Sequence, residues 1–181
     1  MTKYEITTTS HPTNPALHRI RALRDIPHWD VRAGDLGGWV QSKGNLSQSG
    51  NAWVYGNARA SGNARVYGDA WVSGNAEVSG NAQVYSNAQV YSNAWVTRPD
   101  HLLTATVMAS DIFHATLTPT QDGGHILRVG CWTGTVPEFR AMAESDQWVE
   151  ADPGTIRLRR PELLAFAAMC EARIDTWTTE D

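Results

Sequence analysis

The residues best suited to chemistry in this chain are its histidines and its two cysteines. Cys131 with His114 or His125 could form a thiol–imidazole pair, and Asp111 with the same histidines could surround a metal ion. Neither set has the spacing of a nucleophile or zinc motif, and the chain contains no glycine-rich phosphate loop or HExxH sequence. We therefore expect no catalytic residue, no metal site and no cofactor. Cys131 and Cys170 are both expected to be buried, reduced thiols.

Composition and charge narrow the class of protein. The chain has 181 residues, is 41% hydrophobic and carries a formal net charge of -4, which is typical of a folded protein without a strongly basic surface. Binding to nucleic acid is therefore unsupported. No stretch approaches the roughly 18 apolar residues of a membrane span, and residues 1–6 lack a signal-peptide pattern. We expect a protein of the bacterial cytoplasm that does not bind membranes.

A period of six residues dominates the middle of the chain. About ten hexads follow one another between Gly38 and Thr97, in blocks such as SGNAWV and YGNARA. Glycine or serine opens the turn, asparagine follows, and alanine and valine recur two residues apart. Fixed short periods of this kind indicate a repeat architecture.

The hexad predicts a parallel β-helix. Alanine and valine two residues apart point to the same side of a strand, so they face inward and the variable residue between them faces outward. Glycine followed by asparagine tolerates the backbone of a tight corner. Three corners close a coil of eighteen residues, and stacked coils pair strands in parallel at about 4.8 Å. We expect a little over three coils across residues 38–98, with the asparagines bonded to one another in a ladder.

The candidate binding residues are those that face outward from the hexads. Residues at the same hexad position in successive coils form an outward column. On an eighteen-residue coil, aromatic and opposite-charge neighbours lie one layer apart. Exposed tryptophans on the outer sides of the stacked coils favour a homo-oligomer, with a trimer preferred and a dimer next. The alternative is that the terminal segments cover these tryptophans within one chain. The candidates are Trp53, Trp71, Trp95, Tyr67, Tyr85, Arg59 and Arg65.

Residues 1–37 are expected to cap the first coil, since an open coil exposes strand edges. Residues 4–8 are predicted to form a strand, and residues 17–23 a strand or a short helix. The basic run His18, Arg19, Arg21 and Arg24 could bind phosphate, but its alternation with apolar residues favours a strand with one solvated face.

Residues 99–181 lose the period and are predicted to form an α+β segment after Pro99–Asp100. Strands are expected at residues 102–108, 112–117 and 126–129, with a hairpin turn at residues 122–124. One helix is expected at residues 137–144 and another from Pro161. In the second helix an apolar stripe should pack on these strands or on a neighbouring subunit: Leu163, Phe166, Ala167, Cys170, Ile174 and Trp177.

The aliphatic-and-small hexad resembles the repeat of left-handed parallel β-helix proteins. The Gly-Asn-Ala phrasing, preceded by HRIRALRD and AGDLGGWV, is similar to hexapeptide-repeat proteins of phages and prophages, and LRVGCWTGTVPEF is weakly similar to their tail segment. The resemblance implies a phage origin and this fold, and the undisturbed coil with its outward aromatic residues favours a non-enzymatic phage-type binding protein. Its partner would be a bacterial host protein, such as a defence component, or a small nucleotide-like ligand.

An acyltransferase-like enzyme is the alternative within the hexapeptide-repeat class. Such enzymes use a general-base histidine, usually on a loop that leaves the coil. None of the six histidines lies within the hexads, which run without an apparent insertion. The sequence therefore favours the binding protein, and the alternative requires a base from one of the flanks.

Overall fold

The computed structural model describes residues 2–146, 148 and 151–178. The chain divides into two compact units, and the second begins at Leu103, four residues after the expected start at Pro99. Residues 1–37 and the repeat thus belong to one unit. No helix in the described part of the chain has both the length and the apolar character needed to cross a membrane.

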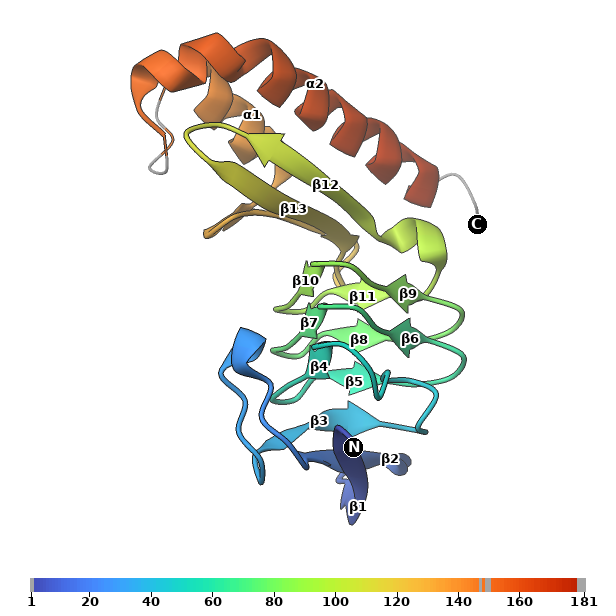
Figure 1. The fold of residues 1–181 in the computed structure, drawn as a ribbon. Helices are drawn as coiled ribbons and strands as arrows, with labels where there is room; N and C mark the ends of the chain where they lie inside the picture. Colours follow the sequence, from blue (N-terminus) through green and yellow to red (C-terminus); the bar gives the residue numbers. More distant parts are fainter. Residues whose placement is uncertain (1, 147, 149–150, 179–181) are drawn as a thin grey trace. The chain divides into compact units, whose positions relative to one another are not determined.

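The first unit is a parallel β-helix, as the hexads predict. Figure 1 shows its short strands as stacked arrows joined by corners. After β3 (Leu36–Val40) the strands are β4 (Trp53–Val54), β5 (Arg59–Ala60), β6 (Arg65–Val66), β7 (Trp71–Val72), β8 (Glu77–Val78), β9 (Gln83–Val84), β10 (Gln89–Val90) and β11 (Trp95–Val96).

Parallel pairing one coil apart creates three sides. The first side consists of β3, β5, β8 and β11, and the second of β4, β7 and β10. The third side consists of β6 and β9, preceded by Leu46, which bridges to Val66 in parallel. The expectation of a little over three coils is confirmed.

The interior is filled by the alanine and valine columns. Val72 and Val78 are fully buried, whereas the outward Trp71 and Glu77 are partly exposed, so the predicted register is correct. The asparagine ladder is also present: Asn51 Nδ2 donates to Asp69 at 2.8 Å, and Asn63 Nδ2 donates to Asn81 at 3.2 Å. These bonds stabilise the corners on the outside while apolar burial stabilises the coils inside.

The repeat does not run unbroken from Gly38, contrary to the sequence prediction. Positive φ angles begin at Gly50 among the hexad glycines and continue at Ser86 and Ser92, but Gly38 and Gly44 lie outside this set. Val54 follows Leu46 by eight residues instead of six, although both occupy inward valine-type positions. The corner between them, residues 47–52, is therefore two residues longer than the others. We call it the long corner.

Residues 2–37 fold against the coils. They form β1 (Tyr4–His11), β2 (Asn14–Ala22) and the 3-10 turn η1 (Pro27–Trp29), with β2 antiparallel to both β1 and β3. On β2, Ile20 and Ala22 are buried while Arg19 and Arg21 alternate with them. The basic run is thus a strand with one solvated face, as favoured from the sequence.

The exposed tryptophan patch expected on the second side does not exist. Trp53 is 0% exposed because the N-terminal segment covers it, with the Tyr4 ring edge-on at 6.3 Å. Trp71 is half-buried between Trp29, at 5.1 Å, and Tyr55, at 5.4 Å between ring centroids. The alternative expectation, in which a terminal segment covers these tryptophans within one chain, is the correct one for both.

The second unit combines an antiparallel sheet with two helices, and the hairpin turn at residues 122–124 lies where expected. The strand β15 was not expected, and the last helix begins at Pro153 rather than at Pro161, which lies inside it. The elements are β12 (Leu103–Met108), β13 (Ile112–Pro119), β14 (His125–Val129), β15 (Trp132–Gly134), α1 (Val136–Glu144) and α2 (Pro153–Thr178).

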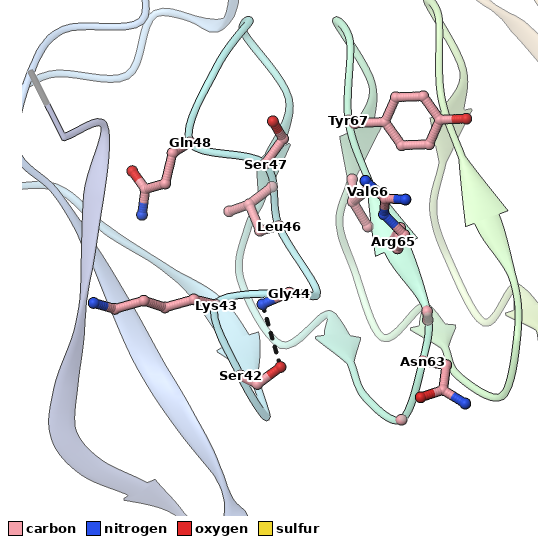
Figure 2. A pocket seen from close by; sticks show the side chains of 12 residues that line it. Ser42, Lys43, Gly44, Leu46, Ser47, Gln48, Asn63, Arg65, Val66 and Tyr67 are labelled. Atoms are coloured by element: carbon pink, nitrogen blue, oxygen red, sulfur yellow. Dashed lines mark hydrogen bonds between the residues drawn. The ribbon is translucent and has the colours of Figure 1, made fainter.

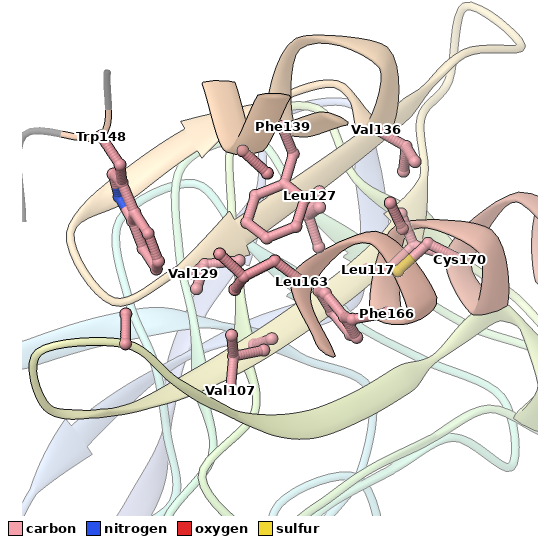
Figure 3. Packing of buried hydrophobic residues seen from close by; sticks show 14 of the residues in the cluster. Val107, Leu117, Leu127, Val129, Val136, Phe139, Trp148, Leu163, Phe166 and Cys170 are labelled. Atoms are coloured by element: carbon pink, nitrogen blue, oxygen red, sulfur yellow. The ribbon is translucent and has the colours of Figure 1, made fainter. Parts of the chain in front are cut away.

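The predicted apolar stripe of α2 packs on the strands of the same unit. Leu163, Phe166 and Cys170 are buried in one core with Leu117 and Leu127, and Figure 3 shows their side chains converging. The helix α1 covers the same core and begins with a capping box between Thr135 and Glu138. The second unit therefore has a hydrophobic core of its own.

Candidate functional site

A hollow of about 460 Å³ opens on the third side of the β-helix (Figure 2). Its walls are the loop before and after Leu46 and the strand β6 with its preceding corner. The side chains and backbone that line it belong to Ser42, Lys43, Gly44, Leu46, Ser47, Gln48, Gly62, Asn63, Ala64, Arg65, Val66 and Tyr67.

The hollow exists because the first coil lacks an outward side chain at this point. Since Leu46 pairs with Val66, Asn45 occupies the position equivalent to Arg65 one coil later. Its amide turns onto the backbone instead: Asn45 Nδ2 donates to Gly62 O at 3.0 Å and to Ala64 O at 2.9 Å. The long corner begins at the next residue after Leu46. Both features remove side-chain volume from the wall.

The N-terminal strand holds the loop that borders the hollow. Gln48 Oε1 accepts from the backbone N–H of Lys3 at 2.8 Å, and Gln48 Nε2 donates to Tyr4 O at 3.1 Å. The Tyr4 hydroxyl donates to Leu46 O at 2.7 Å. One wall is therefore fixed by bonds to β1, and Gln48 is already engaged in them.

The charge in the hollow is positive, because Lys43 and Arg65 line it and no aspartate or glutamate in the described part of the chain does. Within the described residues neither cation forms an ion pair. In Figure 2 the Lys43 side chain extends away from Arg65, so the two cations do not form a clamp. Arg65 lies beside Asn63 and Tyr67, and its Cζ is 5.8 Å from the Tyr67 ring centroid.

Arg65 differs from the equivalent arginine on the first side. Arg59 lies one coil before Glu77, and Arg59 Nη2 is 3.3 Å from Glu77 Oε2. Arg65 lies one coil before the neutral Gln83. Two arginines in the same hexad position thus have different surroundings, and the one beside the hollow lacks a carboxylate in its column.

Tyr67 is held by the following coil. Its ring stacks on Tyr85 at 5.6 Å with an interplanar angle of 19°, and its hydroxyl donates to Gln83 Oε1 at 3.1 Å. Figure 2 shows the ring extending away from Ser47. Tyr67 borders the hollow without presenting a free platform across it.

The structure brings two of the predicted binding residues, Arg65 and Tyr67, to the hollow. Trp95 and Tyr85 are 44% and 41% exposed but do not line it. The prediction is wrong for Trp53, which is inaccessible. Sequence reasoning missed the polar residues Ser42, Lys43, Ser47 and Asn63. The signal that could have found the hollow is Leu46, which follows its glycine by two residues where the valines follow by four.

A second hollow, of about 440 Å³, lies over the strands β1, β2 and β3. Its two arginines already have partners. Arg19 lies 4.6 Å above the Trp39 ring and donates to Gly56 O at 2.9 Å, while Arg21 Nε donates to Glu5 at 2.8 Å. This hollow therefore offers a ligand less unsatisfied charge than the one beside Arg65.

Of the histidines and cysteines of the second unit, Cys170 and His125 have structural surroundings. Cys170 is buried, and desolvation raises its pKa to about 12, but Cys131 is exposed, contrary to the prediction that both thiols are buried. His125 Nε2 accepts from the backbone N–H of Val136 at 2.9 Å, and burial lowers the pKa of this imidazole. Among the described residues, no group of three or more His, Cys, Asp or Glu could hold a metal ion.

The fold and the hollow together define the chain as a short parallel β-helix protein with a polar, positively charged hollow on one side. No protein family, curated protein or solved structure matches it. The resemblance to phage hexapeptide-repeat proteins therefore stays a prediction.

Proposed function

We propose that this protein is a non-enzymatic binding protein that holds a small anionic ligand in the hollow beside Arg65. The hollow has the size of a small-molecule site, so a small ligand fits it better than a host protein does. Arginine presents five N–H donors in a planar fork that matches a carboxylate or phosphate group.

One observation carries the proposal: among the described residues Arg65 has no carboxylate beside it, whereas Arg59 in the equivalent position is paired with Glu77. An arginine whose column offers only amides keeps its donors available for an anion from solution. The lining contributes hydroxyl and amide groups, but no nucleophile–base pair is among its residues. These groups support binding and not turnover.

Isothermal titration calorimetry of the full chain with inorganic phosphate, citrate and ribose 5-phosphate tests the proposal at low salt. We expect at least one of these anions to bind, and Arg65→Ala to weaken it by about 10-fold or more, since hydrogen bonds to charged groups contribute roughly 1.5–3 kcal/mol. The matched control is Arg59→Ala, which removes an arginine from the same hexad position and should leave binding unchanged. Equal losses in both variants, or no binding of any anion, would refute the proposal.

A further inference from the structure

We infer that the ligand is a phosphorylated polyhydroxyl compound of the sugar phosphate class, recognised through its phosphate and its hydroxyl groups and not through an aromatic ring. This inference rests on the proposed function and specifies its ligand. Three features of the hollow support it: the position of Arg65, the hydroxyl and amide groups around it, and the absence of a stacking surface among its lining residues.

The anion would lie at Arg65, and the rest of the hollow is polar. Ser42 and Asn63 are exposed, and Ser47 is half-exposed. Ser47 Oγ is 3.2 Å from Ser49 Oγ, and Ser42 Oγ is 3.2 Å from Asn45 Oδ1, so each hydroxyl uses only part of its bonding capacity within the protein. Asn63 donates Nδ2 to Asn81, and its carbonyl oxygen can accept a bond from a ligand hydroxyl.

The hollow gives a flat apolar ring little to bind. Leu46 and Val66 line it, but both are fully buried within the coil and form only its floor. The single aromatic residue in its lining is Tyr67, which is stacked on Tyr85 and bonded to Gln83 in the next coil. A nucleobase would lose its hydration without gaining a stacking partner. The geometry thus favours a hydroxyl-rich ligand over the nucleotide-like ligand expected from the sequence.

Calorimetric titration of the full chain with inorganic phosphate, ribose 5-phosphate and AMP tests the inference, because each probe adds one chemical group to the previous one. We expect ribose 5-phosphate to bind about 10-fold or more tighter than phosphate, since several neutral hydrogen bonds of about 1 kcal/mol are added. AMP should bind no more than about 3-fold tighter than ribose 5-phosphate, because stacking of the base would add more than that.

The variant Ser47→Ala separates the hydroxyl contribution from the charge. It should weaken ribose 5-phosphate by about 5-fold, the equivalent of one neutral hydrogen bond, and leave phosphate affinity unchanged. Equal affinities for phosphate and ribose 5-phosphate would overturn the inference while leaving anion binding intact. AMP binding more than about 10-fold tighter than ribose 5-phosphate would also overturn it, by showing that the base is recognised. If none of the three probes binds, the inference fails, and the proposed function fails with it when citrate does not bind either.

Discussion

Arg59 and Glu77 are paired across adjacent coils, with Nη2 and Oε2 3.3 Å apart, because the register of β5 and β8 places them in one outward column. The same register places Gln83 one coil after Arg65. A single substitution can therefore give Arg65 the neighbour that Arg59 already has.

Gln83→Glu should reduce anion binding at the hollow by about 10-fold or more, because the new carboxylate would compete for Arg65. The hydroxyl of Tyr67 can still donate to a carboxylate at position 83. The fold should change in stability by less than about 1 kcal/mol, as for other exposed ion pairs. Calorimetry and urea unfolding measure the two effects, with Gln89→Glu on the second side as the control. Undiminished binding in Gln83→Glu would exclude Arg65 as the anion-binding residue.

The register itself is tested by Val72→Asp and Glu77→Gln. Val72 is fully buried, so a carboxylate there has no partner and should unfold the β-helix or destabilise it by several kcal/mol, on the order of 3 or more. Glu77→Gln removes one half-exposed ion pair and should lower the free energy of unfolding by less than about 1 kcal/mol. Urea unfolding followed by circular dichroism compares them. Similar losses in both variants would show that the inward column is misassigned.

Alanine substitutions at two corner glycines distinguish the cost of backbone strain from the cost of a steric collision. Gly50 and Gly56 both have positive φ angles, 69° and 65°. A Cβ on Gly50 would lie 2.5 Å from Gly68 O, whereas the nearest atom to a Cβ on Gly56 is Gly74 O at 3.9 Å. Gly56→Ala should therefore cost about 1–2 kcal/mol for the left-handed backbone, and Gly50→Ala clearly more because the next coil must move. Equal unfolding midpoints in urea would contradict this difference.

Lys3 should make the stability of the first unit depend on pH above neutrality. Its ammonium is buried against Ala52 O at 2.7 Å, and desolvation, followed by the charge of Arg24, lowers its pKa from 10.5 to about 8. Between these values the unfolded chain binds more protons, so stability rises with pH in this window and is lowest with Lys3 charged at and below pH 8.

The measurement is the unfolding free energy of the wild type minus that of Lys3→Met, which should increase by up to about 3 kcal/mol from pH 8 to pH 10.5. Tyr4, whose pKa burial raises to about 12, acts in the opposite direction above pH 10 but is present in both proteins. The exposed Lys43→Met should show no such trend. A difference that stays flat across this range would mean that Lys3 is not buried in its charged form.

Self-association remains a prediction, with a trimer first and a dimer next. Trp95 is 44% exposed, and exposed tryptophans favour an interface. Light scattering at micromolar concentration should give a multiple of 19.9 kDa that falls to the monomer mass in Trp95→Ala. The control is Tyr55→Ala, because Tyr55 is similarly exposed at 48% but stacks on Trp71 within the chain. A wild-type mass of 19.9 kDa would rule out the oligomer.

The sequence predicts the coils well because each hexad specifies its own strand, corner and inward residues. The pairing of Arg59 with Glu77 and of Tyr67 with Tyr85 follows from the same eighteen-residue spacing. The burial of Trp53 could not be predicted in this way. It depends on an N-terminal segment without periodicity that folds back over β4. In this segment Tyr4 contacts Trp53, which lies 49 positions later in the chain.

The hollow was missed for a related reason. The glycine spacing hid the change of phase at Leu46, because Gly38, Gly44 and Gly50 are six residues apart although only Gly50 of the three has a positive φ angle. Arg65 and Tyr67 were found because they occupy outward positions, but outward residues without a hollow look the same in the sequence. In the second unit, α2 was expected to start at Pro161 because proline is common in a first turn, yet Pro161 lies inside the helix.

Because of the long corner, the residues that line the hollow do not depend on the number of coils in the β-helix. This corner confines the hollow to the first two coils, between Ser42 and Tyr67, while every later corner repeats at six residues. Eighteen residues could be added or removed beyond Tyr85 without altering any residue that lines the hollow, because parallel strands of an added coil would restore the same three sides. The number of coils can thus change without changing the hollow. A change of two residues in the long corner would instead alter the wall of the hollow itself.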